Sequence, residues 1–116
     1  MIASQKMISL DSSAARAAAE TTLLQFLCDA HRDLAARRQI LGMLGNYSWR
    51  THDNTIFFEC IRELLARVPR QIVAQLPAAL TRRGFPDMPC EFLTPPSELT
   101  AAAALALAEH LLHRKK

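Results

Sequence analysis

The chain has 116 residues; 50% are hydrophobic, 22% are charged, and 14 basic against 11 acidic residues give a net charge of +3. This length fits one domain whose core needs no disulfide or metal, and it excludes a conventional multi-domain enzyme. The charge excess is too small to identify a nucleic-acid-binding protein by itself.

Three scattered cysteines predict reduced thiols and a cytoplasmic location. No stretch has the length and apolar character of a signal peptide or a membrane span, so we expect no membrane contact. Residues 1–10 have no regular pattern and are expected to form a flexible N-terminal arm before one helical domain over residues 11–116.

A first helix is predicted from the capping residues around Ser13 to about Ala30, with apolar residues in its second half. Its first half is rich in alanine and has little to bury. A second helix is predicted over residues 33–44, because Gly45 and Asn46 then tolerate the left-handed backbone angles that end helices.

The third predicted helix has the clearest pattern, beginning at a cap of Thr51 or Asp53 and ending at Pro69. Its apolar residues follow three-four spacing at Ile56, Phe57, Cys60, Ile61, Leu64, Leu65 and Val68. A fourth helix is predicted to end at the basic pair Arg82 and Arg83, which is followed by Gly84. Pro77 predicts that this fourth segment is split in two or begins late, near Leu76.

Residues 85–95 contain three prolines and predict an irregular, partly buried loop. The last helix is expected over residues 96–113, with a proline and an acid in its first turn. No segment alternates with a period of two. We therefore predict an all-α fold: one compact domain of five or six helices, with a core module over residues 21–85 and the C-terminal helix added to it.

Cys28 and His31 have the C-x2-H spacing of metal ligands, and Cys60 and Cys90 could complete a tetrahedral zinc site. However, structural zinc sites usually take ligands in two closely spaced pairs, and Cys60 and Cys90 stand alone. Cysteines on apolar helix faces also serve as small hydrophobic residues. We expect no metal and no cofactor.

Catalytic candidates are the four histidines, His31, His52, His110 and His113, together with the cysteines. None of them belongs to a recognisable catalytic motif, and no glycine-rich loop that could hold a phosphate is present. We expect a non-enzymatic protein. A small enzyme or metal-binding protein is one alternative, because folding can bring distant residues together.

Nucleic-acid binding is a second alternative, through helices that carry arginines toward phosphates. The arginines considered for this role are Arg32, Arg37, Arg38, Arg50, Arg82 and Arg83. Acidic residues lie within a turn or two of them, which favours solvated helix faces over a helix-turn-helix.

A longer pattern runs through the middle of the chain. Leu23, Leu24 and Leu27 precede Asp29-Ala30-His31; Trp49 and Asn54 lead into FFECIREL; and QLPAALTRRG follows, ending at Gly84. This pattern resembles the helical module at the N-terminus of DnaB-type replicative helicases and its structural relative at the C-terminus of DnaG-type primases. The chain departs from the family at Pro77, in lacking an acidic residue near Gln71, and in having no motor domain.

The resemblance implies a helicase-module-like bundle that mediates protein–protein contacts, with a replication protein as its partner. Tyr47 and Trp49 are expected to pack against the third helix; Trp49 is either a core residue or a partly exposed anchor for a partner. Interaction candidates are Tyr47, Trp49, Arg50, Arg82 and Arg83. The alanine-rich first and last helices predict either mutual packing or pairing across a homodimer.

Overall fold

The computed structural model describes residues 13–114, so the predicted N-terminal arm lies outside the described residues. The described chain is all-α and forms a single domain. Its elements are α1 (Ser13–Cys28), α2 (Leu34–Met43), α3 (His52–Arg67), α4 (Ile72–Arg82), the 3-10 helix η2 (Glu91–Leu93) and α5 (Ala101–Arg114). The predicted fold class is confirmed. Within residues 13–114, no helix is long and apolar enough to cross a membrane.

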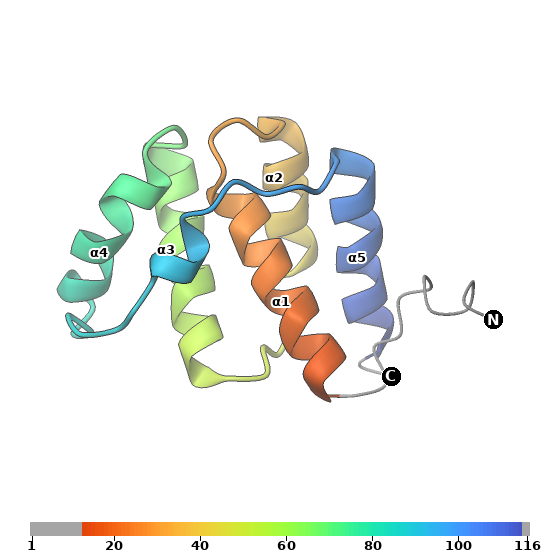
Figure 1. The fold of residues 1–116 in the computed structure, drawn as a ribbon, viewed down its shortest axis with the longest axis horizontal. Helices are drawn as coiled ribbons and strands as arrows, with labels where there is room; N and C mark the ends of the chain where they lie inside the picture. Colours follow the sequence, from red (N-terminus) through yellow and green to blue (C-terminus); the bar gives the residue numbers. More distant parts are fainter. Residues whose placement is uncertain (1–12, 115–116) are drawn as a thin grey trace.

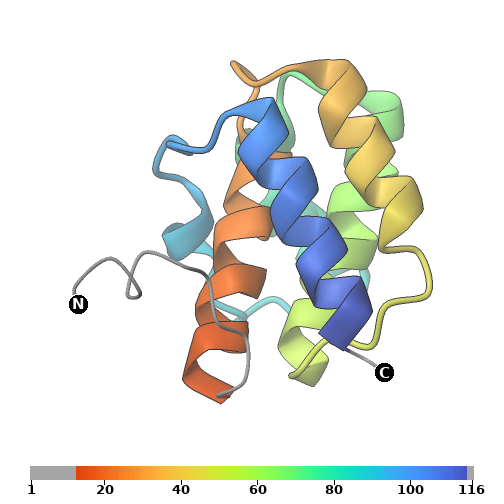
Figure 2. The same ribbon diagram turned by 90° about the vertical axis from the view of Figure 1, so that its right-hand side faces the viewer.

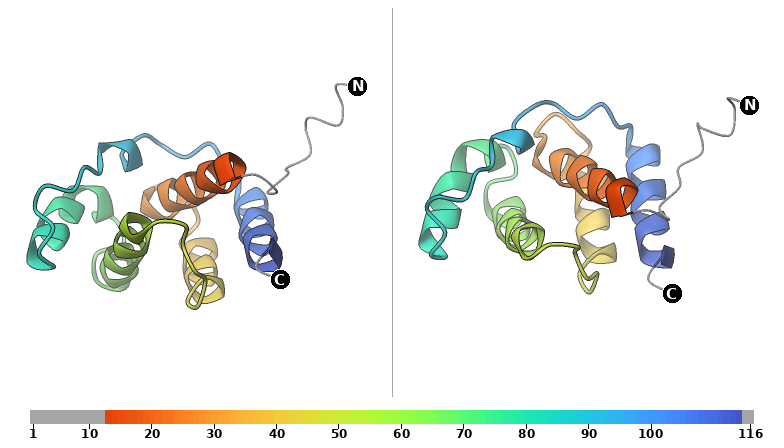
Figure 3. Two further views of the ribbon diagram at one scale, coloured as in Figure 1. Left: turned by 90° about the horizontal axis from the view of Figure 1, so that it is seen from below. Right: turned by 60° about the horizontal axis from the view of Figure 1, so that its bottom comes forward.

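The helices form two layers. Figures 1 and 3 show α4, α3, α2 and α5 side by side in a row, with α1 lying across one side of it. The segment between α4 and α5 runs over the same side as α1 and carries η2 (Figure 1). From the side, α5 lies against both α1 and α2 (Figure 2).

Local signals explain where three of these helices begin or end. The side chain of Asp33 accepts a hydrogen bond from the N–H of Ala36 and caps α2. Thr51, rather than Asp53, caps α3 by accepting from the N–H of Asn54. Gly84 follows α4 with a φ of 94°, a backbone angle that glycine adopts without a steric penalty.

The prediction that Pro77 splits or delays the fourth helix is wrong, because α4 runs without interruption from Ile72 to Arg82 with Pro77 inside it. Pro77 itself is exposed, while Ile72, Leu76 and Leu80 are buried on both sides of it. Packing of this stripe against α3 holds the two halves together and compensates for the backbone hydrogen bond that proline cannot donate.

The last helix begins later than predicted, at Ala101 instead of residue 96. Residues 96–100 are held in a non-helical conformation, because the N–H of Ser97 donates to the buried carboxylate of Asp29 and the N–H of Leu99 donates to the hydroxyl of Ser97. Thr100 then caps α5, accepting from the N–H of Ala103.

The core extends well beyond the central helices. α5 contributes four buried residues, Ala104, Leu107, Ala108 and Leu111. These pack in one cluster with the buried residues of α1, among them Ala19, so the small-residue faces of the two helices meet within one chain. Mutual packing of the first and last helices is confirmed; pairing across a homodimer stays a prediction.

Candidate functional site

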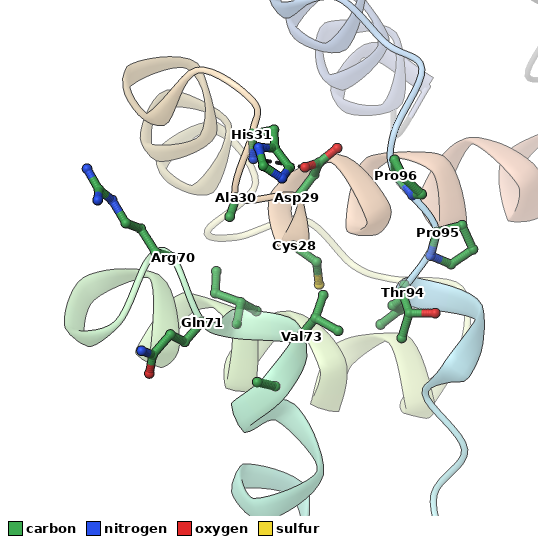
Figure 4. Close-up of a pocket in the computed structure, with 13 residues that line it drawn as sticks. Cys28, Asp29, Ala30, His31, Arg70, Gln71, Val73, Thr94, Pro95 and Pro96 are labelled. Carbon is green, nitrogen blue, oxygen red and sulfur yellow. Dashed lines mark hydrogen bonds between the residues drawn. The ribbon is translucent and has the colours of Figure 1, made fainter.

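Apolar and charged residues from distant segments line a pocket of about 430 Å3, which we call the corner pocket. Three segments that are distant in sequence form it: the end of α1 with the turn after it, the start of α4 with the two residues before it, and the end of η2 with the stretch after it (Figure 4). Its lining residues are Cys28, Asp29, Ala30, His31, Arg70, Gln71, Ile72, Val73, Ala74, Leu93, Thr94, Pro95 and Pro96.

Cys28, at the end of α1, points toward the space between Val73 and Thr94 (Figure 4). Burial raises the pKa of its thiol to about 12. At neutral pH this thiol is therefore protonated, and a protonated thiol is a poor nucleophile and a poor metal ligand. Together with Ile72 and Leu93, which are both buried, Cys28 gives the pocket an apolar inner wall.

Asp29 has a structural task at this corner. Its Oδ1 accepts from the N–H of His31, its Oδ2 accepts from the N–H of Ser97, and Arg32 forms an ion pair with it at 3.3 Å. Burial acts to raise the pKa of Asp29, but the two backbone hydrogen bonds and the Arg32 charge outweigh burial and leave the pKa below its usual value. The carboxylate is thus ionised and occupied, tying α1 to the segment before α5.

The rim of the pocket is cationic at its α4 side. Arg70 is exposed, and within the described chain it has no acidic partner. Gln71, the residue before α4, makes no capping hydrogen bond with its side chain. The first N–H groups of a helix lack partners in their own helix and carry a partial positive charge, so Arg70 and the start of α4 both favour an anionic group.

The two aromatic interaction candidates belong to the core. Tyr47 is 6% exposed and Trp49 is 9% exposed. The Trp49 ring lies 5.1 Å from the ring of Phe58 on α3 and 5.0 Å from that of Tyr47. Packing against the third helix is confirmed for Trp49, whereas Tyr47 contacts Trp49 together with Arg16 and Glu20 of α1. Both side chains are buried, so neither is available at the surface as an anchor for a partner.

The charged candidates lie in separate places. Arg50 is exposed just before α3, at the other end of that helix from the corner pocket. Arg82 is exposed in the last turn of α4. Arg83 reaches across to α3, where its two terminal nitrogens lie 3.3 Å from carboxylate oxygens of Glu59 and Glu63.

The structure does not bring the four candidate metal ligands together. Cys28 and His31 share the corner pocket, Cys60 is buried on α3, and Cys90 is half-buried in the segment before η2. Among residues 13–114, no group of three or more histidine, cysteine or acidic side chains is arranged to hold a metal ion. His52, His110 and His113 are exposed and lie outside the corner pocket.

Sequence reasoning missed the role of Glu20, which lies in the alanine-rich half of α1 yet is fully buried. Its carboxylate accepts hydrogen bonds from the Tyr47 hydroxyl, the Arg50 N–H and the Asn54 amide. The expectation that this half of the helix has little to bury is therefore wrong. The sequence feature that points to this role is a single acidic residue among alanines, with potential hydrogen-bond donors at Tyr47 in the connector and Asn54 in the helix after it.

No family model, no curated protein and no solved structure matches the chain. The resemblance to the helicase and primase modules stays a prediction.

Proposed function

We propose that the protein is a non-enzymatic interaction module that binds a short segment of a partner protein in the corner pocket. The observation that carries this proposal is the pocket's construction: an apolar wall around Cys28, Ile72 and Leu93, bordered by Arg70, whose charge has no acidic partner among residues 13–114. A cytoplasmic location, expected from the free thiols, is part of the proposal.

The charge arrangement indicates the chemistry of the occupant. An apolar side chain of the partner would enter the pocket and be removed from water there. An acidic group beside it would face Arg70 and the uncapped start of α4. We therefore expect a segment in which a large apolar residue adjoins an aspartate or a glutamate.

Binding suits this pocket better than catalysis does. Its thiol is protonated at neutral pH and its buried carboxylate is fully used in hydrogen bonds and an ion pair. Neither group is therefore free to act as nucleophile or general base. A replication protein remains the partner class that the family resemblance implies.

Selection of short random peptides displayed on phage, followed by affinity measurements on the enriched peptides, tests the proposal. Ala74 lines the pocket, is exposed, and precedes Ala78 by one turn of α4, where Ala78 is exposed outside the pocket. We expect Ala74→Tyr to fill the pocket and weaken peptide binding about tenfold or more, equivalent to about 1.4 kcal/mol. Ala78→Tyr is the matched control and should bind as the wild type does.

Arg70→Glu provides the test of charge. It should weaken the binding of acidic peptides and leave an otherwise identical peptide with glutamine in place of the acid nearly unaffected. Failure to enrich any peptide, or equal losses in the Ala74 and Ala78 variants, would show that the corner pocket is not the binding site.

A further inference from the structure

A second surface of the protein concentrates arginines from three neighbouring helices. Arg38 of α2 and Arg62 of α3 line one hollow, of about 190 Å3, between these helices. On the other side of α3, Arg67 and Arg82 line a hollow of about 410 Å3 toward α4. Arg83 lies close to Arg67, because both contact Glu63 of α3, and Arg83 also contacts Glu59. We call Arg38, Arg62, Arg67, Arg82 and Arg83 the arginine face.

The carboxylates on this surface do not balance its positive charge. Glu63 is shared between Arg67 and Arg83, and Glu59 also contacts Arg83. In residues 13–114, Arg38, Arg62 and Arg82 form no ion pair; Arg62 lies 5.5 Å from the centre of the Phe58 ring. Three cationic side chains on three adjacent helices are thus left to attract an anion.

The spread of these charges favours an extended anion over a single carboxylate. They lie on both sides of α3, so one ligand that meets all of them has to cross this helix. Figure 1 shows α4, α3 and α2 side by side in one row, so a ligand that crosses α3 would reach from α4 to α2. Guanidinium groups match phosphates and carboxylates equally well in geometry, so a further observation is needed to separate the two.

The exposed hydrophobic side chains distinguish a phosphate ligand from the carboxylates of a protein ligand. Protein interfaces depend on a few large apolar or aromatic anchors, whereas contact with a phosphate backbone does not. Among the described residues, the exposed large hydrophobic side chain is Phe92, which lies on η2 and outside the arginine face. We propose that the arginine face binds the phosphodiester backbone of nucleic acid, independently of base sequence.

Anisotropy titrations of the full chain against short labelled oligonucleotides test this inference at two salt concentrations. Duplex DNA, single-stranded DNA and RNA distinguish the sources of the phosphates. We expect affinity to fall steeply as salt rises, because phosphate contacts release counterions, and to depend little on base sequence. Absence of binding at low salt would overturn the inference.

Single neutralising variants locate the contact. Arg38→Gln, Arg62→Gln and Arg82→Gln should each weaken binding several-fold and lower the slope of log affinity against log salt by about one. Arg50→Gln removes the same charge from an exposed arginine at the opposite end of α3 and should change neither quantity. Circular dichroism checks that each variant keeps its helical content.

Two results would contradict the proposal. An equal loss of affinity in Arg50→Gln would show that binding follows net charge and not this face. Tighter binding of polyglutamate than of any oligonucleotide, lost in the same three variants, would assign the face to an acidic protein segment instead.

Discussion

The hydroxyl of Tyr47 donates a hydrogen bond of 2.6 Å to Oε2 of Glu20, whose side chain is completely buried. Arg16 in turn donates to the same hydroxyl at 2.8 Å. Through Glu20, the connector before α3 and the first turn of α3 are both fastened to α1. Both carboxylate oxygens of Glu20 are therefore hydrogen-bonded, as a buried polar group requires.

We expect Glu20→Ala to lower the free energy of unfolding by about 3 to 5 kcal/mol, because buried donors on Tyr47, Arg50 and Asn54 lose their acceptor. Tyr47→Phe should lower it less, by about 1 to 3 kcal/mol. Urea unfolding monitored by circular dichroism measures both. A Glu20→Ala variant as stable as the wild type would show that the carboxylate is not a structural acceptor.

Arg37 and Arg38 are adjacent residues with opposite environments. Arg37 is 1% exposed and donates to the carbonyls of Leu27 and Pro69, which joins the end of α1 to the turn between α3 and α4. Arg37→Met should lower the free energy of unfolding by about 2 to 4 kcal/mol, since two carbonyls lose their donor. Arg38→Met, at an exposed position, should change it by less than about 0.5 kcal/mol. Similar losses in the two variants would contradict this assignment.

Asp29 should make the fold sensitive to acid. Its pKa in the folded protein lies below its usual value of 3.8, so it stabilises the fold above that pH, and this contribution is lost as the pH falls through the folded pKa. Asp29→Asn should therefore be less stable at neutral pH, yet lose less stability on acidification. Free energies of unfolding measured from about pH 6 downward check this prediction, because that series begins about two pH units above the usual pKa of an aspartate. Parallel curves for the two proteins would exclude the role.

The sequence predicts features that depend on neighbouring residues. The apolar spacing from Ile56 to Leu65 identifies α3, and the sequence narrows its cap to Thr51 or Asp53, of which Thr51 is the one that caps it. In both cases the residues that define the feature lie within a few turns of one another, where helix geometry relates spacing in sequence directly to position in space.

Features built from distant segments escape such reasoning. Glu20 is buried because Tyr47 and Asn54, 27 and 34 residues later, supply donors to it. The start of α5 is delayed because Asp29 holds Ser97 across 68 residues. The corner pocket likewise combines three separate segments. Each of these depends on how the helices pack, which local propensity does not determine.

Pro77 leaves α4 with a backbone hydrogen bond missing in its middle, at an exposed position. Pro77→Ala should restore the bond and raise the free energy of unfolding by about 1 to 2 kcal/mol. This figure is a net gain, because the unfolded chain has more conformational entropy without the proline. Pro86→Ala, at an exposed proline in the loop after α4, serves as the control and should give no gain. An increase in both variants, or in neither, would contradict the explanation. Thermal and urea unfolding provide the measurement.

Alkaline pH should destabilise the fold through Cys28 and Tyr47. Burial raises the pKa of Cys28 from 9.0 to about 12, and burial together with the hydrogen bond to Glu20 raises that of Tyr47 from 10.0 to about 12. The folded state therefore holds these protons more tightly than the unfolded state does. Their contribution to stability is complete below the unfolded pKa values and is lost as the pH rises toward 12.

Replacement of the titrating groups should flatten this pH dependence. Cys28→Ala and Tyr47→Phe each remove one proton that the folded state retains, so stability should fall less steeply above pH 9 than it does in the wild type. The comparison uses slopes, and a general loss of stability from either substitution does not affect it. Urea midpoints taken at intervals through the alkaline range provide the measurement. Slopes equal to that of the wild type in both variants would show that neither group is protected from ionisation in the folded protein.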